Sequence, residues 1–151
     1  LLYLDKKIHF LAKKEHFDNF LENAWHTYMG AIPLNRQRGG RKAIKSAIKK
    51  LRNGKIIVIY PEGTRTLTGD MQKAKTGVAR LALLSKSPVL PIGLIGNFEI
   101  LPKGKYIPKF KKADINIGKP MQFSNYYNKK ISKRILREVA NQVMKEIAKL
   151  S

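Results

Sequence analysis

Short apolar segments alternate with longer amphipathic segments along this chain of 151 residues, and this order restricts the possible fold most strongly. Segments that are apolar throughout, or that alternate apolar and polar residues, predict strands at 8–12, 31–34, 56–60, 89–95 and 113–118. Segments with apolar residues three and four positions apart predict helices at 16–29, 41–53, 73–84 and about 132–150. Strands that alternate with helices indicate an α/β fold, here one layered domain with a mixed, largely parallel central sheet flanked by helices.

Local residue choices add detail to these predictions. The helix at 41–53 carries Ile, Ala and Leu side chains on one face and lysines on the other. Asn53–Gly54 provides a stop for this helix, because glycine readily adopts the conformation that ends one. Pro33 has no amide hydrogen to donate, so we expect its strand at the edge of the sheet.

Residue type also predicts how deeply each strand is buried. The continuous apolar runs at 56–60 and 89–95 predict buried strands. The strict alternation at 113–118 predicts a half-buried strand. Prolines, a glycine and five lysines between positions 97 and 112 predict an exposed loop with at most a short strand.

Composition limits the class of protein. A length of 151 residues suits one domain, and an apolar fraction of 43% is enough for a hydrophobic core. The sequence contains no cysteine, which excludes disulfides and thiolate metal sites. It contains no run of about 18 apolar residues, the length that a membrane-spanning helix needs. The first residue is Leu1 rather than methionine, so we expect a longer parent protein.

Positive charge is the dominant bulk property of the chain. Thirty-one Lys and Arg residues oppose ten Asp and Glu residues, for a net charge of +21. Such an excess favours polyanionic partners: nucleic acid, anionic lipid surfaces or acidic proteins. A solubilising charge without any specific partner is an equally good interpretation, so charge alone does not select among these classes.

The segment 56–65 carries the most chemical information. Its apolar strand runs directly into Pro61-Glu62-Gly63-Thr64-Arg65, which supplies an acid, a flexible backbone position, a hydroxyl and a guanidinium. In open α/β sheets ligands bind at the carboxyl ends of the strands, and a glycine there lets the backbone approach a ligand closely. A guanidinium can hold a phosphate with two parallel hydrogen bonds. The segment therefore predicts a ligand site that suits a phosphate.

Four blocks of this kind occur in order along the chain: Ala12-Lys13-Lys14-Glu15, Gly30-Ala31-Ile32-Pro33-Leu34-Asn35-Arg36, Tyr60-Pro61-Glu62-Gly63-Thr64-Arg65 and Val89-Leu90-Pro91-Ile92. Each block alone is a weak signal, whereas the third block in the right order with the others is a strong one. With these blocks the chain resembles the glycerolipid acyltransferase family, and most closely its 1-acyl-glycerol-3-phosphate (lysophosphatidic acid) acyltransferases. The similarity extends from about Phe10 to the terminal helix.

The resemblance implies that basic residues from separate blocks hold the phosphate of the acceptor. Arg36 and Arg65 match the family's phosphate-binding residues, and Lys13 matches a lysine that helps to neutralise the same phosphate. The turn 62–64 would shape the glycerol-phosphate site, and Lys75 matches a basic residue near the pocket. The substrate-binding residues expected in this way are Lys13, Arg36, Glu62, Gly63, Thr64, Arg65 and Lys75.

The family's reaction depends on a His-x-x-x-x-Asp pair, in which the aspartate orients a histidine that takes the proton of the attacking hydroxyl. None of the three histidines, His9, His16 and His26, has an aspartate five residues later. His9 lies in an apolar strand and is expected to be a packing residue. The resemblance places the pair just before Leu1. We therefore expect residues 1–151 to be an acyltransferase domain without its N-terminal part, with no catalytic residue of its own and no activity as this piece.

The resemblance implies acyl transfer from acyl-CoA or acyl carrier protein to lysophosphatidic acid, giving phosphatidic acid in phospholipid biosynthesis. It also implies a membrane-associated enzyme on the cytoplasmic face, with an anionic membrane surface as partner, no nucleic acid, no metal and no bound cofactor. Two alternative functions stay open. One is a basic nucleic-acid-binding module, suggested by charge alone and without any helix-turn-helix, RNP-type or zinc signature. The other is a catalytically dead family member that binds lipid.

Individual residues also have plainer interpretations. Arg36 lies near Arg38 and Arg41, so a diffuse basic patch is an alternative to a phosphate ligand. Trp25 and Tyr28 either pack within the fold or lie at a lipid interface. The lysines of the helix at 41–53 form a solvated face or contact anionic headgroups.

Overall fold

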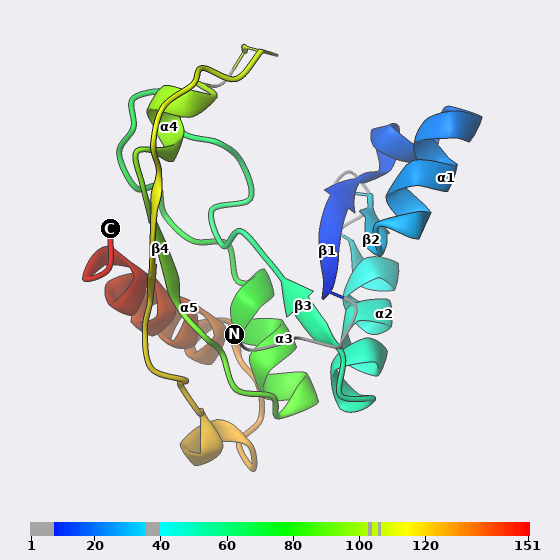
Figure 1. Cartoon of the computed structure of the whole chain (residues 1–151). Coiled ribbons are helices and arrows are strands. Elements are labelled where there is room, and N and C mark those ends of the chain that lie inside the picture. Colours follow the sequence, from blue (N-terminus) through cyan, green and yellow to red (C-terminus); the bar gives the residue numbers. More distant parts are fainter. Residues whose placement is uncertain (1–7, 36–39, 103, 106) are drawn as a thin grey trace.

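The computed structural model describes residues 8–35, 40–102, 104–105 and 107–151 of the chain. It has an α/β architecture with a parallel sheet flanked by helices, as the sequence predicts (Figure 1). In chain order its elements are β1 (Ile8–Lys13), η1 (Lys14–Phe17), α1 (Phe20–Tyr28), β2 (Ala31–Leu34), α2 (Arg41–Arg52), β3 (Ile56–Val58), α3 (Gly77–Ser85), β4 (Ile92–Ile95), α4 (Asn97–Ile100), β5 (Asp114–Ile117), η2 (Ser124–Tyr126) and α5 (Lys133–Ala148).

The strands form two separate sets within the described residues. β1 pairs in parallel with both β2 and β3, in the order β2-β1-β3, so Pro33 lies on an edge strand as predicted. β4 and β5 form an antiparallel pair of their own, with Ile92 opposite Ile117 and Ile95 opposite Asp114. The sheet that carries the site is therefore purely parallel, and the antiparallel part of the expected mixed sheet stands apart from it.

The register of the parallel sheet brings the carboxyl ends of its strands to one edge. Lys13, the last residue of β1, is the partner of Leu34, the last residue of β2. Val58 at the end of β3 is the partner of Phe10. The segments that follow β1, β2 and β3 therefore all begin near the same edge of the sheet, where an α/β fold places its ligands.

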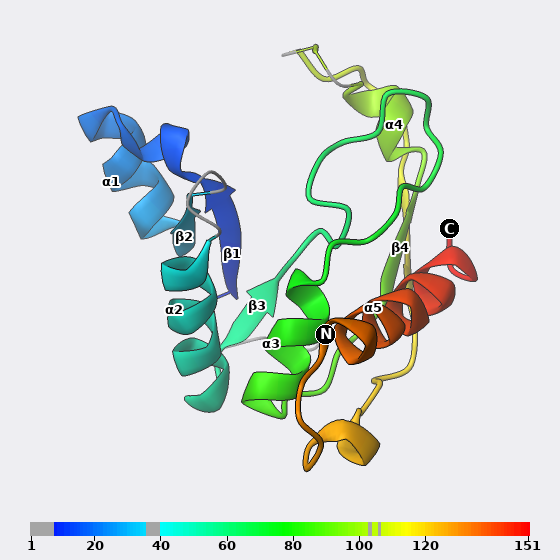
Figure 2. The same ribbon diagram turned by 180° about the vertical axis from the view of Figure 1, so that it is seen from behind.

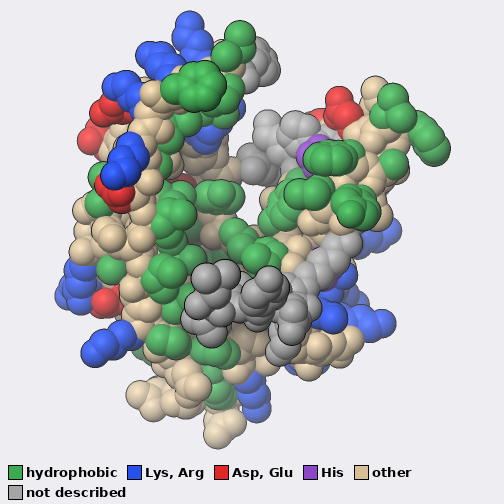
Figure 3. Space-filling model, viewed as in Figure 1, with side chains coloured by type: hydrophobic (Ala, Val, Ile, Leu, Met, Phe, Trp, Pro, Cys, Tyr) green, Lys and Arg blue, Asp and Glu red, His purple; other side chains and the backbone are tan. Residues whose placement is uncertain are grey.

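The hydrophobic core consists of two clusters that meet at α3. The larger cluster packs α3 against α5, and Val139 and Val143 are its largest fully buried side chains. The smaller cluster packs the parallel sheet against α2 and includes Leu81 of α3. Ile59, just after β3, packs against both clusters. The space-filling view shows two arms that rise from a common base (Figure 3).

The two arms enclose a hollow that opens at the upper end in Figure 3. We call the part with β1, β2, β3, α1 and α2 the sheet arm, and the part with β4, α4 and β5 the hairpin arm (Figures 1 and 2). Hydrophobic side chains lie along the hairpin arm and in the hollow (Figure 3).

The strands are less buried than the sequence predicts. The expectation that β5 is half-buried is wrong, because Ile115 and Ile117 are 64% and 65% exposed. The expectation of buried strands is wrong for β4, where Ile92 and Ile95 are exposed. It holds only in part for β3, where Val58 is exposed but Ile57 packs against the smaller cluster. The physical reason is the separation of the two strand sets, since each leaves uncovered a face that one continuous layered sheet would have packed.

The four predicted helices are present with shifted ends, but the prediction of a loop with at most a short strand at 97–112 is wrong at its start, where α4 forms. α2 ends where Asn53–Gly54 was expected to stop it, and Gly54 has a φ of 70°. α1 begins later than predicted because the side chain of Asn19 caps it by accepting a hydrogen bond from the amide of Leu21. Among the described helices, none is long and apolar enough to span a bilayer.

Candidate anion-binding site

The turn after β3 is held in a conformation that only glycine adopts easily. The amide of Gly63 donates a hydrogen bond to the carbonyl oxygen of Tyr60 at 3.0 Å, which closes the turn. Gly63 has a φ of 73°, in the left-handed region that disfavours residues with a Cβ atom. This glycine is therefore needed for the turn itself.

Lys75 fills the space beside that glycine. The amide of Lys75 donates to the carbonyl oxygen of Pro61 at 2.8 Å, which fastens the second segment to the turn. A Cβ atom built on Gly63 would lie only 3.0 Å from Cδ and 3.3 Å from Nζ of Lys75. The structure thus brings together two predicted site residues, Gly63 and Lys75, that are twelve positions apart in the sequence.

Arg137 of α5 supports the segment that carries Lys75. Its Nη1 donates a hydrogen bond to the carbonyl oxygen of Ala74 at 2.6 Å. This contact also accounts for the late start of α3, which was predicted at residue 73. Residues 74 and 75 use their backbone groups to bind Arg137 and Pro61 instead of continuing a helix. Sequence reasoning missed Arg137, because no local pattern indicates a bond between residues so far apart.

The described contacts of Glu62 and Thr64 lie within their own loop. The carboxylate of Glu62 accepts a hydrogen bond from the amide of Gln72 at 2.7 Å, in a half-buried position. That bond closes the loop between residues 62 and 72. Thr64 is exposed, and its hydroxyl donates a long bond of 3.5 Å to the carbonyl oxygen of Arg65. Glu62 therefore shapes the site by holding a loop, while the Thr64 hydroxyl stays accessible.

Arg65 reaches from the turn toward the hairpin arm. Its side chain is exposed, and Nη1 donates to the carbonyl oxygen of Leu101 at 3.4 Å, just after α4. The ion pairs of the described residues are Lys111–Glu99 and Lys149–Glu146, so neither Arg65 nor Lys75 is paired there with a carboxylate. The Lys75 ammonium beside the glycine turn is therefore an unneutralised cation that favours an anion there, and Arg65 extends from the same turn toward Leu101.

The side chains of the two other predicted cations, Lys13 and Arg36, are outside the described part of the structure. Lys13 ends β1 at the expected sheet edge, but its side chain lies outside the described part of the structure. Arg36 lies outside the described residues altogether, and Asn35 is the last described residue of that segment. That Arg36 and Arg65 converge on one phosphate therefore stays a prediction.

The two histidines with described side chains have packing roles. His9 is only 7% exposed, and its Nδ1 donates a hydrogen bond to the carbonyl oxygen of Gly30 at 2.9 Å. This confirms the expectation that it is a packing residue. The ring of His26 lies 5.5 Å from that of Phe17. Within the described residues, no group of three or more His, Cys, Asp or Glu side chains could hold a metal ion.

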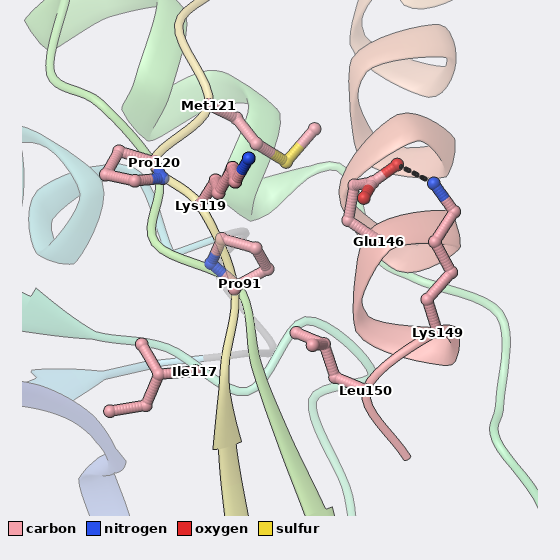
Figure 4. A pocket seen from close by; sticks show the side chains of 9 residues that line it. Pro91, Ile117, Lys119, Pro120, Met121, Glu146, Lys149 and Leu150 are labelled. Atoms are coloured by element: carbon pink, nitrogen blue, oxygen red, sulfur yellow. Dashed lines mark hydrogen bonds and ion pairs between the residues drawn. The ribbon is translucent and has the colours of Figure 1, made fainter.

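A pocket of about 500 Å³ lies elsewhere, between the hairpin arm and the end of α5 (Figure 4). Pro91 of the fourth sequence block lines it, together with Ile117, Met121 and Leu150. The ion pair of Glu146 and Lys149 stands at one side. None of the predicted substrate-binding residues lines this pocket, so it is not the candidate site.

Comparisons with known proteins support the resemblance found in the sequence. A family model described as Acyltransferase matches residues 1–95. The chain is 32% identical over 146 residues to the 1-acyl-sn-glycerol-3-phosphate acyltransferase of Bacillus subtilis, covering 95% of this chain and 70% of that protein. It is 28% identical over 146 residues to the protein of the same name from Streptococcus pneumoniae, covering 96% of this chain and 52% of that protein.

A solved structure is also similar. The crystal structure of the 1-acyl-sn-glycerophosphate (LPA) acyltransferase PlsC from Thermotoga maritima matches with a TM-score of 0.71 at 29% identity. The match covers 95% of this chain and 57% of that chain. The chain thus spans between 52% and 70% of the length of these three proteins. These matches confirm the predicted family and the α/β fold.

Proposed function

The chain belongs to the acyltransferase family, and from this premise we propose that the complete protein is a 1-acylglycerol-3-phosphate O-acyltransferase of phospholipid biosynthesis. It transfers an acyl group from an acyl thioester to the free hydroxyl of lysophosphatidic acid, giving phosphatidic acid. The observation that carries this proposal is the pair of unneutralised cations, Lys75 and Arg65, at the turn after β3. A phosphate monoester is the anionic group of the acceptor, and it matches these cations.

In this proposal the chain binds and orients the acceptor. Arg65 and Lys75 hold the phosphate, joined by Lys13 and Arg36 from the neighbouring strand ends, while the turn 62–64 borders the glycerol. Holding two reactants in the correct geometry can lower a barrier by about 7–11 kcal/mol. The acceptor hydroxyl oxygen forms a bond to the acyl carbon, the carbon–sulfur bond breaks, and the thiol leaves. A histidine–aspartate pair that precedes Leu1 in the complete protein moves the proton from the hydroxyl to the leaving sulfur.

The strong positive charge suits both substrates of this reaction. Coenzyme A and acyl carrier protein are acidic, and lysophosphatidic acid is an anionic lipid, so a net charge of +21 favours all three. We place the complete protein on the cytoplasmic face of a membrane, where the acceptor and the product reside.

The Arg65→Ala variant of the complete protein tests this assignment. Loss of a hydrogen bond to a charged group costs about 1.5–3 kcal/mol, so we expect the KM for lysophosphatidic acid to rise at least about tenfold. The KM for the acyl donor should change little. Arg134→Ala is a matched control, because it removes the same charge from the exposed start of α5.

Two results would contradict the proposal. Equal rises in both Michaelis constants for Arg65→Ala would show that Arg65 does not act on the acceptor. Absence of turnover with lysophosphatidic acid and any acyl thioester in the unaltered complete protein would exclude the reaction itself.

A further inference from the structure

The loop between α4 and β5 presents hydrophobic side chains to solvent. Ile107 is 83% exposed and Phe110 is fully exposed, so the folded chain covers almost nothing of either. Lys105, Lys109 and Lys112 are exposed in the same loop. A single exposed hydrophobic residue needs no explanation, but two large ones interleaved with lysines on a protruding loop form a defined chemical pattern.

Two contacts fasten the base of this loop to α4. The amide of Lys109 donates to the carbonyl oxygen of Ile100 at 2.8 Å, which closes the loop on the end of α4. The ammonium of Lys111 forms an ion pair with the carboxylate of Glu99 in α4. Ile107 thus lies within the closed loop, and Phe110 lies between the two lysines that fasten it. The loop extends from the upper end of the hairpin arm in both views (Figures 1 and 2).

A neighbouring turn adds to this end of the molecule. A Cβ atom built on Gly69 would meet the ring of Phe98 in α4 at 3.4 Å, so the turn around residue 69 lies against α4. Leu67 in that turn is 72% exposed. Lysine and hydrophobic side chains lie side by side at this upper end in Figure 3. We call Leu67 and residues 105, 107, 109, 110 and 112 the apical surface.

From this pattern we propose that the apical surface docks onto an anionic lipid bilayer, with Ile107 and Phe110 inserted at the headgroup boundary. The lysines complement anionic headgroups, and the hydrophobic side chains leave water only if they enter an apolar phase. A small convex tip cannot bury the roughly 800 Å² per partner that a stable protein interface needs. A net charge of +21 also opposes contact with a second copy of the chain.

This inference rests on the proposed membrane location and names the surface responsible for it. The apical surface adjoins the candidate anion site, because Arg65 donates its hydrogen bond to Leu101 at the start of the same loop. A bilayer seated there lies at the open end of the hollow between the arms (Figure 3). An acceptor lipid could then reach the cations at the turn while its acyl chain stays in the membrane.

Vesicle binding of the complete protein with charge-matched variants tests the proposal. The first variant carries Lys105→Ala, Lys109→Ala and Lys112→Ala. The control carries Lys42→Ala, Lys45→Ala and Lys49→Ala on the exposed face of α2 and loses the same charge. The vesicles contain phosphatidylcholine and phosphatidylglycerol in equal parts. Each lysine near an anionic surface contributes a several-fold factor, so we expect binding at least about tenfold weaker for the first variant and much less change for the control.

A label on the apical surface tests insertion directly. The chain has no cysteine, so Phe110→Cys offers one attachment point for an environment-sensitive fluorophore in the complete protein, with any cysteine outside this chain replaced. We expect a blue-shifted emission with the same vesicles, and quenching by spin-labelled lipid. A label attached through Asn141→Cys, on the exposed side of α5, should show neither effect.

Three outcomes would overturn the proposal. Equal weakening in both lysine variants would assign binding to overall charge. An unshifted label at position 110 on vesicles that do bind the protein would remove this surface from the contact. If the protein bound duplex DNA more tightly than vesicles, and the first lysine variant lost this DNA binding, the ligand of the apical surface would be nucleic acid rather than lipid. Failure of the unaltered protein to bind vesicles would instead refute the membrane location, while the Arg65→Ala kinetics test acyl transfer separately.

Discussion

Replacing Gly63 by alanine perturbs the candidate site at the point where the backbone of the turn contacts the side chain of Lys75. Gly63 has a φ of 73°, and a left-handed conformation costs a residue with a Cβ atom about 1–2 kcal/mol. The new methyl group would stand 3.0 Å from Cδ and 3.3 Å from Nζ of Lys75. Because the lysine side chain can rotate away, the crowding costs little stability but moves the ammonium from its place.

The size of the functional effect follows from the bond that Lys75 would make to the phosphate. A hydrogen bond to a charged group contributes about 1.5–3 kcal/mol, which corresponds to about 10–150-fold in a binding constant. A displaced ammonium keeps part of this attraction. We therefore expect Gly63→Ala to raise the KM for lysophosphatidic acid about tenfold, with a much smaller change in the KM for the acyl donor.

Gly54→Ala is the matched control for backbone strain. Gly54 has a φ of 70°, but a Cβ atom built on it meets nothing within 4 Å. Both variants should lose about 1–2 kcal/mol of unfolding free energy in urea titrations. Initial rates of the complete protein are then measured with each substrate varied while the other is saturating. They separate the effect on phosphate binding, expected only in Gly63→Ala, from the backbone strain that both variants share. An unchanged KM for lysophosphatidic acid in Gly63→Ala, or equal KM values in both variants, would refute a role of Lys75 in binding the phosphate.

Two further predictions concern the hairpin arm. A Cβ atom at Gly93 would lie 2.4 Å from the carbonyl oxygen of Leu150, so Gly93→Ala should lower the unfolding free energy by about 1–3 kcal/mol. The control Gly77→Ala, whose new Cβ atom would have its nearest contact at 3.6 Å, should not lower it. Equal midpoints of urea unfolding for the two variants would contradict this prediction. The hydrogen bond from Lys111, and then its charge, lower the pKa of Glu99 below the ordinary value of 4.5. Folding is therefore favoured by this carboxylate above that value, and the gain disappears as the pH falls through the lowered pKa. Lys111→Met should raise the pKa in an NMR titration, and an unchanged midpoint would show that the pair does not persist in solution.

Periodicity and turn residues were sufficient to predict the order and type of most elements. The lysine-backed helix at 41–53 and its stop at Asn53–Gly54 follow from local chemistry, because a helix face and a glycine end are properties of a few adjacent residues. Pro33 indicated its edge strand for the same reason. The family blocks also placed Gly63 and Lys75 in one site, and the structure brings these two residues together.

Burial and long-range support could not be read from the sequence. Ile115 and Ile117 alternate as a half-buried strand would, but alternation does not reveal whether another layer covers the strand. The contact from Arg137 to Ala74 spans 63 positions of the sequence, and the contact from Arg65 to Leu101 spans 36. Such contacts depend on how α5 and α4 pack, and no local pattern records that packing.

The position of α3 between the two hydrophobic clusters links the stability of the sheet arm to that of α5. Leu81 belongs to the cluster of the sheet arm, while Val78, about one turn earlier, and Ala82, the next residue, belong to the cluster built with α5. Neither cluster can lose this helix without exposing its own apolar surface, so the sheet arm and α5 should unfold as a single cooperative unit. Since Lys75 lies just before α3, any substitution that loosens either cluster would also disturb the cation beside the glycine turn.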